Sequence, residues 1–118
     1  MTHEIEQKLT DIFPWVDSTQ FDCGDGWQWI IVAMLKEIDD YYFDSYRKCY
    51  IDIWQAKEKF GALIIYWGVC AEEDAIAIAN IFHKYEELSK STCEICGDEG
   101  KLLRDEYWVT VRCEECRI

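Results

Sequence analysis

Hydrophobic residues recur at helical spacing near the start of the chain. Ile5, Leu9 and Ile12 fall three or four residues apart, so they lie on one face of a helix. Pro14 follows them, and proline cannot continue a helix because it lacks a backbone N–H group. The pattern predicts a first helix over Glu4–Phe13.

A second helical pattern starts at the Gly-Asp-Gly-Trp sequence of residues 24–27. Asp25 is the predicted N-cap, because its carboxylate can accept a hydrogen bond from a backbone N–H group of the first turn. Gln28, three residues later, matches the capping-box pattern. We expect this helix to extend to residues 42–45. Its expected buried stripe consists of Trp27, Ile31, Met34, Leu35 and Ile38.

The hydrophobic period changes to two after the second helix. Ile51 and Ile53 alternate with polar and aromatic residues over residues 50–57, and a second alternating run covers residues 62–69. The segment Lys57–Gly61 between the two runs ends in glycine, as a hairpin turn commonly does. The pattern predicts an antiparallel β-hairpin.

A third helical pattern follows the hairpin. Three carboxylates open it at residues 72–74, where they are favourable because the N-terminal end of a helix is positive. A polar stretch at residues 89–92 ends it. The order of elements predicts an α+β fold, with helices packed on a small antiparallel β-hairpin or sheet. The apolar stripe of this helix consists of Ile78, Ile81, Phe82, Tyr85 and Leu88.

The end of the chain contains four cysteines in two pairs. Cys93 and Cys96 are followed, after sixteen residues, by Cys113 and Cys116, which gives the pattern C-x2-C-x16-C-x2-C. This spacing is typical of a four-cysteine zinc site, in which each pair closes a tight loop that directs two thiolates at one metal ion. Gly97 follows the second cysteine, where such a loop needs a residue that tolerates positive φ.

We expect one structural Zn²⁺ at these four cysteines. Catalytic zinc keeps a position open for water, and four cysteines leave none open. Two short runs typical of strands, at residues 101–104 and 107–112, separate the cysteine pairs. Residues 91–118 are therefore expected to form a zinc ribbon, and residues 1–90 an α+β body with the order α-α-β-β-α.

The chain is strongly acidic. Its formal net charge is −12 over 118 residues, and residues 93–118 hold 7 acidic and 4 basic residues, so the expected ribbon is acidic as well. Proteins that bind nucleic acid obtain most of their affinity from lysine and arginine at the phosphates. The composition therefore disfavours nucleic-acid binding and favours a basic protein partner.

Cysteine usage and the N-terminal sequence indicate the compartment. Seven cysteines would suggest disulfides in a secreted protein, but four of them match a metal site. The first residues show neither the basic nor the apolar region of a signal peptide, and no apolar run is long enough to span a membrane. We expect a cytoplasmic protein in which Cys23, Cys49 and Cys70 are reduced.

Three motifs together resemble those of a known family. Over residues 24–116, the chain resembles a family of small phage and bacterial proteins. The resemblance implies the layout given above and a phage origin, and it implies no activity. The family often has a basic residue after the position of Leu63, where this chain has Ile64. The motifs are Gly-Asp-Gly-Trp at residues 24–27, Lys-Glu-Lys-Phe-Gly at residues 57–61 followed by Leu63 and Tyr66, and the two CxxC pairs.

Two groups of carboxylates and one tryptophan are candidates for binding a partner. The carboxylates of the second helix lie three or four residues apart, and the other group opens the third helix. The tryptophan lies on the first hairpin strand, and tryptophan is a common interface anchor. The simpler interpretation is a solvated acidic surface that gives solubility. The candidate residues are Glu37, Asp40, Tyr41, Asp44, Trp54, Glu72, Glu73 and Asp74.

The first functional hypothesis is a non-enzymatic, acidic, zinc-containing binding protein. It would be a phage-encoded inhibitor that binds a basic nucleic-acid-handling protein of the host, such as a defence nuclease. Carboxylates on one helix face lie about 5–6 Å apart at Cβ, so their row can mimic the phosphates of nucleic acid.

Two alternatives from other functional classes remain open. One is an enzyme with an unrecognised site at Cys23 or His83, since a thiol near a helix N-terminus can have a lowered pKa. Neither residue has a recognisable catalytic partner in the sequence. The other is a nucleic-acid-binding ribbon that uses Lys101, Arg104, Arg112 and Arg117.

Overall fold

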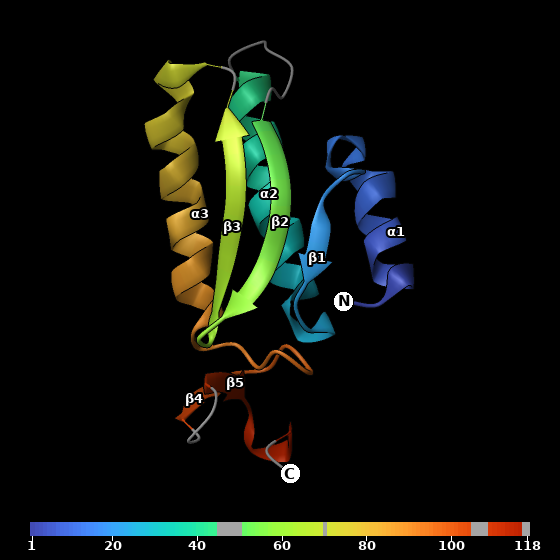
Figure 1. Cartoon of the computed structure of the whole chain (residues 1–118), viewed down its shortest axis with the longest axis vertical. Coiled ribbons are helices and arrows are strands. Elements are labelled where there is room, and N and C mark those ends of the chain that lie inside the picture. The colour runs from blue at the N-terminus through green and yellow to red at the C-terminus, as the bar shows by residue number, and fades with distance from the viewer. Residues whose placement is uncertain (45–50, 70, 105–108, 117–118) are drawn as a thin grey trace.

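A computed structural model describes residues 1–44, 51–69, 71–104 and 109–116 (Figure 1). The architecture is α+β, as the sequence predicts. Four short 3-10 turns are η1 (Pro14–Val16), η2 (Asp25–Trp27), η3 (Glu72–Asp74) and η4 (Glu114–Cys116). In chain order, the main elements are α1 (His3–Ile12), β1 (Gln20–Asp22), α2 (Gln28–Asp44), β2 (Ile51–Lys59), β3 (Ala62–Val69), α3 (Ala75–Ser89), β4 (Lys101–Arg104) and β5 (Val109–Arg112).

The main sheet has the strand order β1-β2-β3, with β2 in the centre. Ala56 of β2 pairs with Phe21 of β1 in parallel and with Ile65 of β3 in antiparallel orientation. The predicted hairpin is therefore present, and β1 extends it to a mixed sheet. The sequence pattern did not reveal β1, because three residues are too few to show an alternation.

The helices cover the sheet unequally. α2 passes behind β2 and β3 in Figure 1, α3 runs alongside the outer edge of β3, and α1 lies beyond β1. α2 supplies the largest part of the core, and each fully buried large apolar side chain contributes about 1.5–3 kcal/mol. Its buried residues are Ile30, Ile31, Met34, Leu35, Ile38 and Tyr42, and Trp27 of η2 is buried beside them.

The start of the second helix differs from the prediction. A 3-10 turn precedes α2, and Gly24 occupies the cap position of that turn without a side-chain hydrogen bond. The carboxylate of Asp25 instead accepts a hydrogen bond of 2.8 Å from the backbone N–H group of Thr2. The capping-box prediction was wrong because a long-range contact with the N-terminal segment occupies the carboxylate that would have capped the helix.

The hairpin between β2 and β3 closes through a two-residue turn, Phe60–Gly61. Both residues have positive φ, 53° for Phe60 and 81° for Gly61. Two positive φ values are typical of a type I′ turn, which fits the twist of an antiparallel hairpin and prefers Asn-Gly. Phenylalanine is strained in this conformation, and its side chain is 74% exposed, so it gains little burial in return.

Phe60→Asn should stabilise the protein. Asparagine tolerates the left-handed conformation, so the substitution should raise the free energy of unfolding by about 1 kcal/mol. Urea denaturation monitored by tryptophan fluorescence measures this change. Phe43→Asn is the matched control, because Phe43 is 77% exposed on α2 and has ordinary helical geometry. The control should change stability by less than about 0.5 kcal/mol. Equal effects of the two substitutions would contradict the assignment of strain to Phe60.

Candidate metal centre

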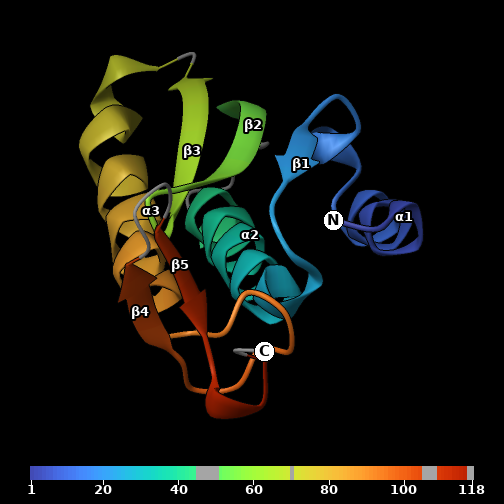
Figure 2. The same ribbon diagram turned by 60° about the horizontal axis from the view of Figure 1, so that its bottom comes forward.

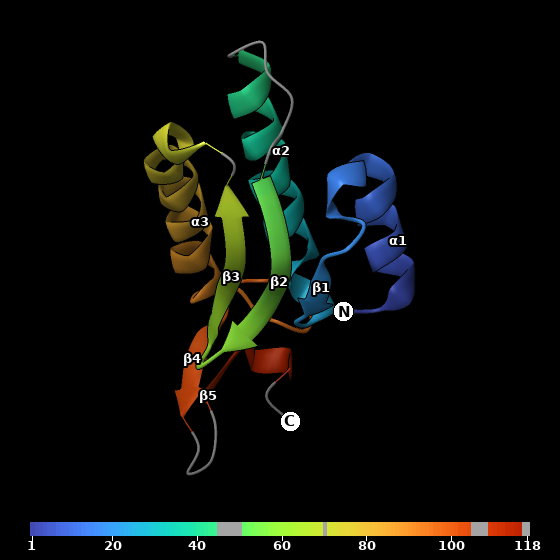
Figure 3. The same cartoon turned by 45° about the horizontal axis from the view of Figure 1, so that its top comes forward.

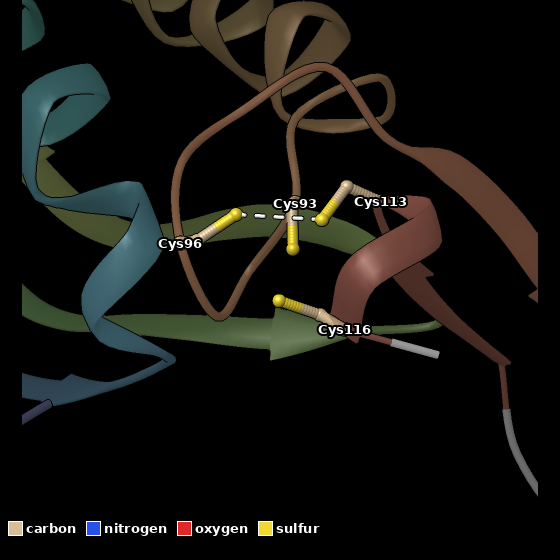
Figure 4. A group of neighbouring side chains, drawn as sticks. All are labelled: Cys93, Cys96, Cys113 and Cys116. Carbon is tan, nitrogen blue, oxygen red and sulfur yellow. Dashed lines mark hydrogen bonds between the residues drawn. The ribbon is translucent and has the colours of Figure 1, made fainter. Parts of the chain in front are cut away.

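Four cysteines from two separate segments meet at the end of the molecule. Cys93 and Cys96 lie in the loop between α3 and β4, Cys113 directly follows β5, and Cys116 ends η4. Figure 4 shows the four side chains directed toward one centre. All four sulfur atoms lie within 4.8 Å of one another, so the predicted ligand set is brought together and could hold a metal ion.

The spacing of the sulfurs fits metal ligands and excludes a disulfide between Cys96 and Cys113. The Sγ atoms of Cys96 and Cys113 are 3.5 Å apart, whereas a disulfide bond measures about 2.05 Å. Sulfurs at the corners of a tetrahedron with metal–sulfur bonds of about 2.3 Å lie about 3.8 Å apart. Cys93 and Cys113 are buried, while Cys96 is exposed.

The ionisation of the cluster favours a bound cation. Burial of Cys93 disfavours its thiolate, but backbone N–H groups, that of Cys113 foremost, donate to its sulfur and lower its pKa to about 6. The hydrogen bond with the sulfur of Cys113 raises the pKa of Cys116 to about 12. Four adjacent sulfurs therefore cannot all ionise near neutral pH unless a cation offsets their charge.

The first cysteine loop has the backbone geometry that the sequence predicts. Gly97 adopts a φ of 85°, and its N–H group donates to the carbonyl oxygen of Cys93 at 2.9 Å. The loop is also bound to the following ribbon, because the N–H group of Glu94 donates to the carbonyl oxygen of Val111 at 3.0 Å. These bonds hold Cys93 and Cys96 in position on the same side as the second cysteine pair.

Two glycines of the Gly-Asp-Gly-Trp sequence receive this loop. The N–H group of Gly26 donates to the carbonyl oxygen of Glu94 at 2.8 Å, and that of Gly24 to the carboxylate of Glu94 at 3.0 Å. A Cβ atom on Gly26 would lie 2.4 Å from the carbonyl oxygen of Cys93 and 2.6 Å from the backbone nitrogen of Gly97. The sequence pattern indicated a helix start at this motif. It did not reveal the second role of the motif, which is close backbone contact with the cysteine loop.

Two tryptophans next to these glycines add further bonds to the ribbon. The buried indole of Trp27 donates to the carbonyl oxygen of Thr92 at 2.9 Å. The indole of Trp29 donates to the carbonyl oxygen of Gly97 at 3.2 Å, and its ring remains 47% exposed. The body of the protein therefore contacts the cysteine loop through both backbone and side-chain donors.

The hairpin turn contacts the other side of the ribbon. A Cβ atom on Gly61 would lie 2.3 Å from Cδ1 of Leu102, and Val109 and Val111 lie just beyond it. Figure 2 shows β4 and β5 below the turn between β2 and β3. The Lys-Glu-Lys-Phe-Gly sequence thus provides a close contact for the ribbon in addition to closing the hairpin.

Four of the predicted acidic residues are exposed. Asp40 and Asp44 near the end of α2 are exposed, and so are Glu72 and Glu73 of η3. Figures 1 and 3 show that the C-terminal end of α2 and the beginning of α3 lie at the end of the molecule opposite the ribbon. Four of the predicted carboxylates therefore share one end of the protein.

The remaining predicted residues of this group make internal contacts. Asp74 is only 2% exposed, and its carboxylate accepts a hydrogen bond of 2.6 Å from the hydroxyl group of Tyr41. Glu37 forms an ion pair with Lys84 of α3. The burial of Asp74 corrects the prediction, because its side chain joins α2 to η3 and is not part of the accessible acidic surface.

Trp54 is exposed, as a partner-binding residue must be. Its side chain is 56% exposed, and its indole donates to the carboxylate of Asp52 at 2.8 Å. The ring lies over Gly68 of β3, where a Cβ atom would come within 3.1 Å of it. Its role in binding stays a prediction.

The candidate residues of the enzyme alternative are Cys23 and His83. Cys23 is buried, and burial raises its pKa to about 12, which disfavours the reactive thiolate. His83 is exposed on α3, and its Nδ1 atom lies 3.6 Å from the carboxylate of Glu86. Together with Glu87, these two residues form a second group of side chains that could hold a metal ion.

The basic residues proposed for nucleic-acid binding are placed on the ribbon strands. Lys101 and Arg104 are exposed on β4, and Arg112 donates to the carbonyl oxygen of Cys116 at 3.3 Å. Arg117, Cys49 and Cys70 lie outside the described residues.

Comparisons of the chain with known protein families, with curated proteins and with solved structures found no match. Within the described part of the chain, no helix combines the length and apolarity needed to cross a membrane. The metal centre is thus assigned from its own geometry and donor chemistry.

Gly26→Ala should weaken metal binding. The added methyl group would displace the loop that carries Cys93 and Cys96, so metal affinity should fall about 10–100-fold, the range for residues that support metal ligands. Competition with a chromophoric chelator measures the affinity. Gly68→Ala is the matched control, because its methyl group meets only the exposed ring of Trp54. Unchanged metal affinity in Gly26→Ala would show that the contact between Gly26 and the first cysteine loop does not position the ligands.

Proposed function

We propose that this chain is a non-enzymatic binding protein, built on one structural Zn²⁺, whose acidic surface binds a basic protein partner. The convergence of the four sulfurs carries the metal part of the proposal. Thiolates are soft ligands that suit zinc, and four of them complete a tetrahedron. Such a site has no open position for water or substrate, so its role is to stabilise a ribbon too short to bury a core of its own.

The charge distribution supports a basic partner. The net charge of −12 is large for 118 residues, and carboxylates at Asp40, Asp44, Glu72 and Glu73 share the end of the molecule opposite the ribbon. A field of this sign accelerates association with cationic surfaces and repels nucleic acid.

A more specific proposal concerns the identity of the partner. We propose a nucleic-acid-handling host protein, such as a defence nuclease, whose cationic groove the acidic end occupies in place of nucleic acid. Two features support it: Asp40 and Asp44 are exposed one helical turn apart, and the sequence motifs resemble those of small phage and bacterial proteins. Under this proposal the chain acts as an inhibitor.

The metal part predicts one zinc per chain. Elemental analysis of protein purified without added metal should find one equivalent of zinc, because four thiolates bind Zn²⁺ tightly at neutral pH. Cys96→Ser should lose most of it, whereas Cys23→Ala, which alters a buried thiol outside the cluster, should keep it. Metal-free protein, or iron in place of zinc, would contradict the proposal.

The partner part predicts salt-sensitive binding that depends on the acidic end. A partner captured from host lysate should bind at least tenfold more weakly at high salt, because screening removes the attraction between exposed charges. The double substitution Asp40→Asn/Asp44→Asn should weaken binding and reduce this salt dependence.

Asp11→Asn/Asp17→Asn is the matched control, since it removes two exposed carboxylates in and after α1. Its affinity should stay close to that of the wild type. Partner affinity that does not change with salt concentration, or an equal loss of affinity in both double variants, would refute a specific role of the acidic end.

A further inference from the structure

One edge of the main sheet offers backbone groups for further pairing. β3 is the outermost strand of the sheet. The N–H group of Leu63 donates to the hydroxyl group of Ser89 at 2.8 Å, so it points away from β2. Backbone direction alternates along a strand, so the N–H and C=O groups of Ile65 and Trp67 point the same way. Among the residues the structure describes, these outward groups have no hydrogen-bond partner.

A groove lies between this edge and α3. Its cavity measures about 210 Å³ and includes Ile65 and Trp67 on the strand side and Phe82 on the helix side. The rings of Trp67 and Phe82 meet edge to face with their centroids 5.0 Å apart, which gives the groove an apolar floor. Figures 1 and 2 show α3 running alongside the outer edge of β3 over this length.

The helix wall of the groove is open and carries one carboxylate, that of Glu86, which lies 3.6 Å from Nδ1 of His83. Ala79, His83 and Glu86 also line the cavity, and their spacing places them on one face of α3. Ala79 is small and exposed, so it leaves the groove accessible. No lysine or arginine lines the described groove, and Glu86 provides a carboxylate there. An extended segment that carries a cationic side chain is therefore complementary to this wall.

We propose that the groove between β3 and α3 binds an extended basic segment of a protein partner as an added strand. The backbone of this segment pairs with Ile65 and Trp67, its alternate apolar side chains contact the Trp67–Phe82 floor, and a lysine or arginine lies beside Glu86. The inference rests on the proposed function, because it specifies how the basic partner is held. A second copy of this chain is a poor occupant, since two molecules of charge −12 repel each other.

A synthetic peptide of alternating lysine and valine tests the groove directly. It should bind the zinc-loaded full-length protein, and a matched peptide of alternating glutamate and valine should bind at least tenfold more weakly. Amide hydrogen exchange at Ile65 and Trp67 should slow at least tenfold in the complex. Exchange at Ile64 and Tyr66 should not change, because their N–H groups already face β2. Absence of binding at millimolar peptide, or protection that spares Ile65 and Trp67, would overturn the proposal.

Substitutions on α3 locate the binding site. Ala79→Arg should reduce peptide affinity at least tenfold, because the long cationic side chain fills the groove and repels the peptide. Asn80→Arg is the matched control, because Asn80 is exposed and does not line the cavity. Glu86→Lys should reverse the preference between the two peptides. Circular dichroism checks that each variant is folded, and equal effects at residues 79 and 80 would overturn the assignment.

The proposals for the groove and for the acidic end can be refuted independently. If the peptide does not bind but the captured partner keeps its salt-sensitive affinity for the wild type, the groove is refuted and the proposed function stands. If the peptide binds in the groove while partner binding ignores both salt and Asp40→Asn/Asp44→Asn, the acidic end is refuted. If the amides of Ile65 and Trp67 are already protected from hydrogen exchange in the free protein, and the protein is a dimer in solution, a second copy of the chain occupies the groove. That result would overturn the proposal.

Discussion

The close contact between the first cysteine loop and two glycines is the constraint on which the rest of the structure depends. Gly24 and Gly26 lack side chains, so the backbone around Cys93 approaches them to hydrogen-bond distance. This contact fixes one half of the sulfur cluster against the body. Gly61, in the hairpin turn, brings β4 and β5 against the body at a second point. A metal bound by all four sulfurs would then join the two halves covalently.

The sulfur cluster and the proposed binding surfaces lie at different positions along the long axis of the molecule. The sulfur cluster lies at one end, and the exposed carboxylates of α2 and η3 lie at the other (Figure 1). The groove between β3 and α3 runs between these ends. The Tyr41–Asp74 hydrogen bond joins α2 to η3, and the Lys84–Glu37 ion pair joins α2 to α3. The proposed binding surfaces therefore rest on packed elements, which reduces the conformational entropy that this protein itself loses on binding.

Local patterns predicted most of the fold and the clustering of the four cysteines. The helices and the hairpin follow from hydrophobic spacing, and the cysteine cluster follows from the CxxC pairs, because both signals lie within a few residues. The unpredicted features depend on contacts between distant residues. The pairing of β1 with β2, the bond from Thr2 to Asp25 and the contact of the two glycines with the cysteine loop all belong to this class. The burial of Asp74 is of the same kind, since only the packing of η3 against α2 distinguishes it from the exposed Glu73. Spacing alone also overestimated the core, because Leu88 lies on the predicted apolar stripe of the third helix and is 36% exposed.

The central claim is that four cysteine sulfurs close around one zinc ion. X-ray absorption spectroscopy at the zinc edge of the purified protein tests it most directly, because the method reports the identity, number and distance of the ligand atoms. The account predicts a single shell of four sulfurs at about 2.3 Å, with no nitrogen or oxygen ligand. A shell that mixes sulfur with nitrogen or oxygen would show an open or different site and would contradict it.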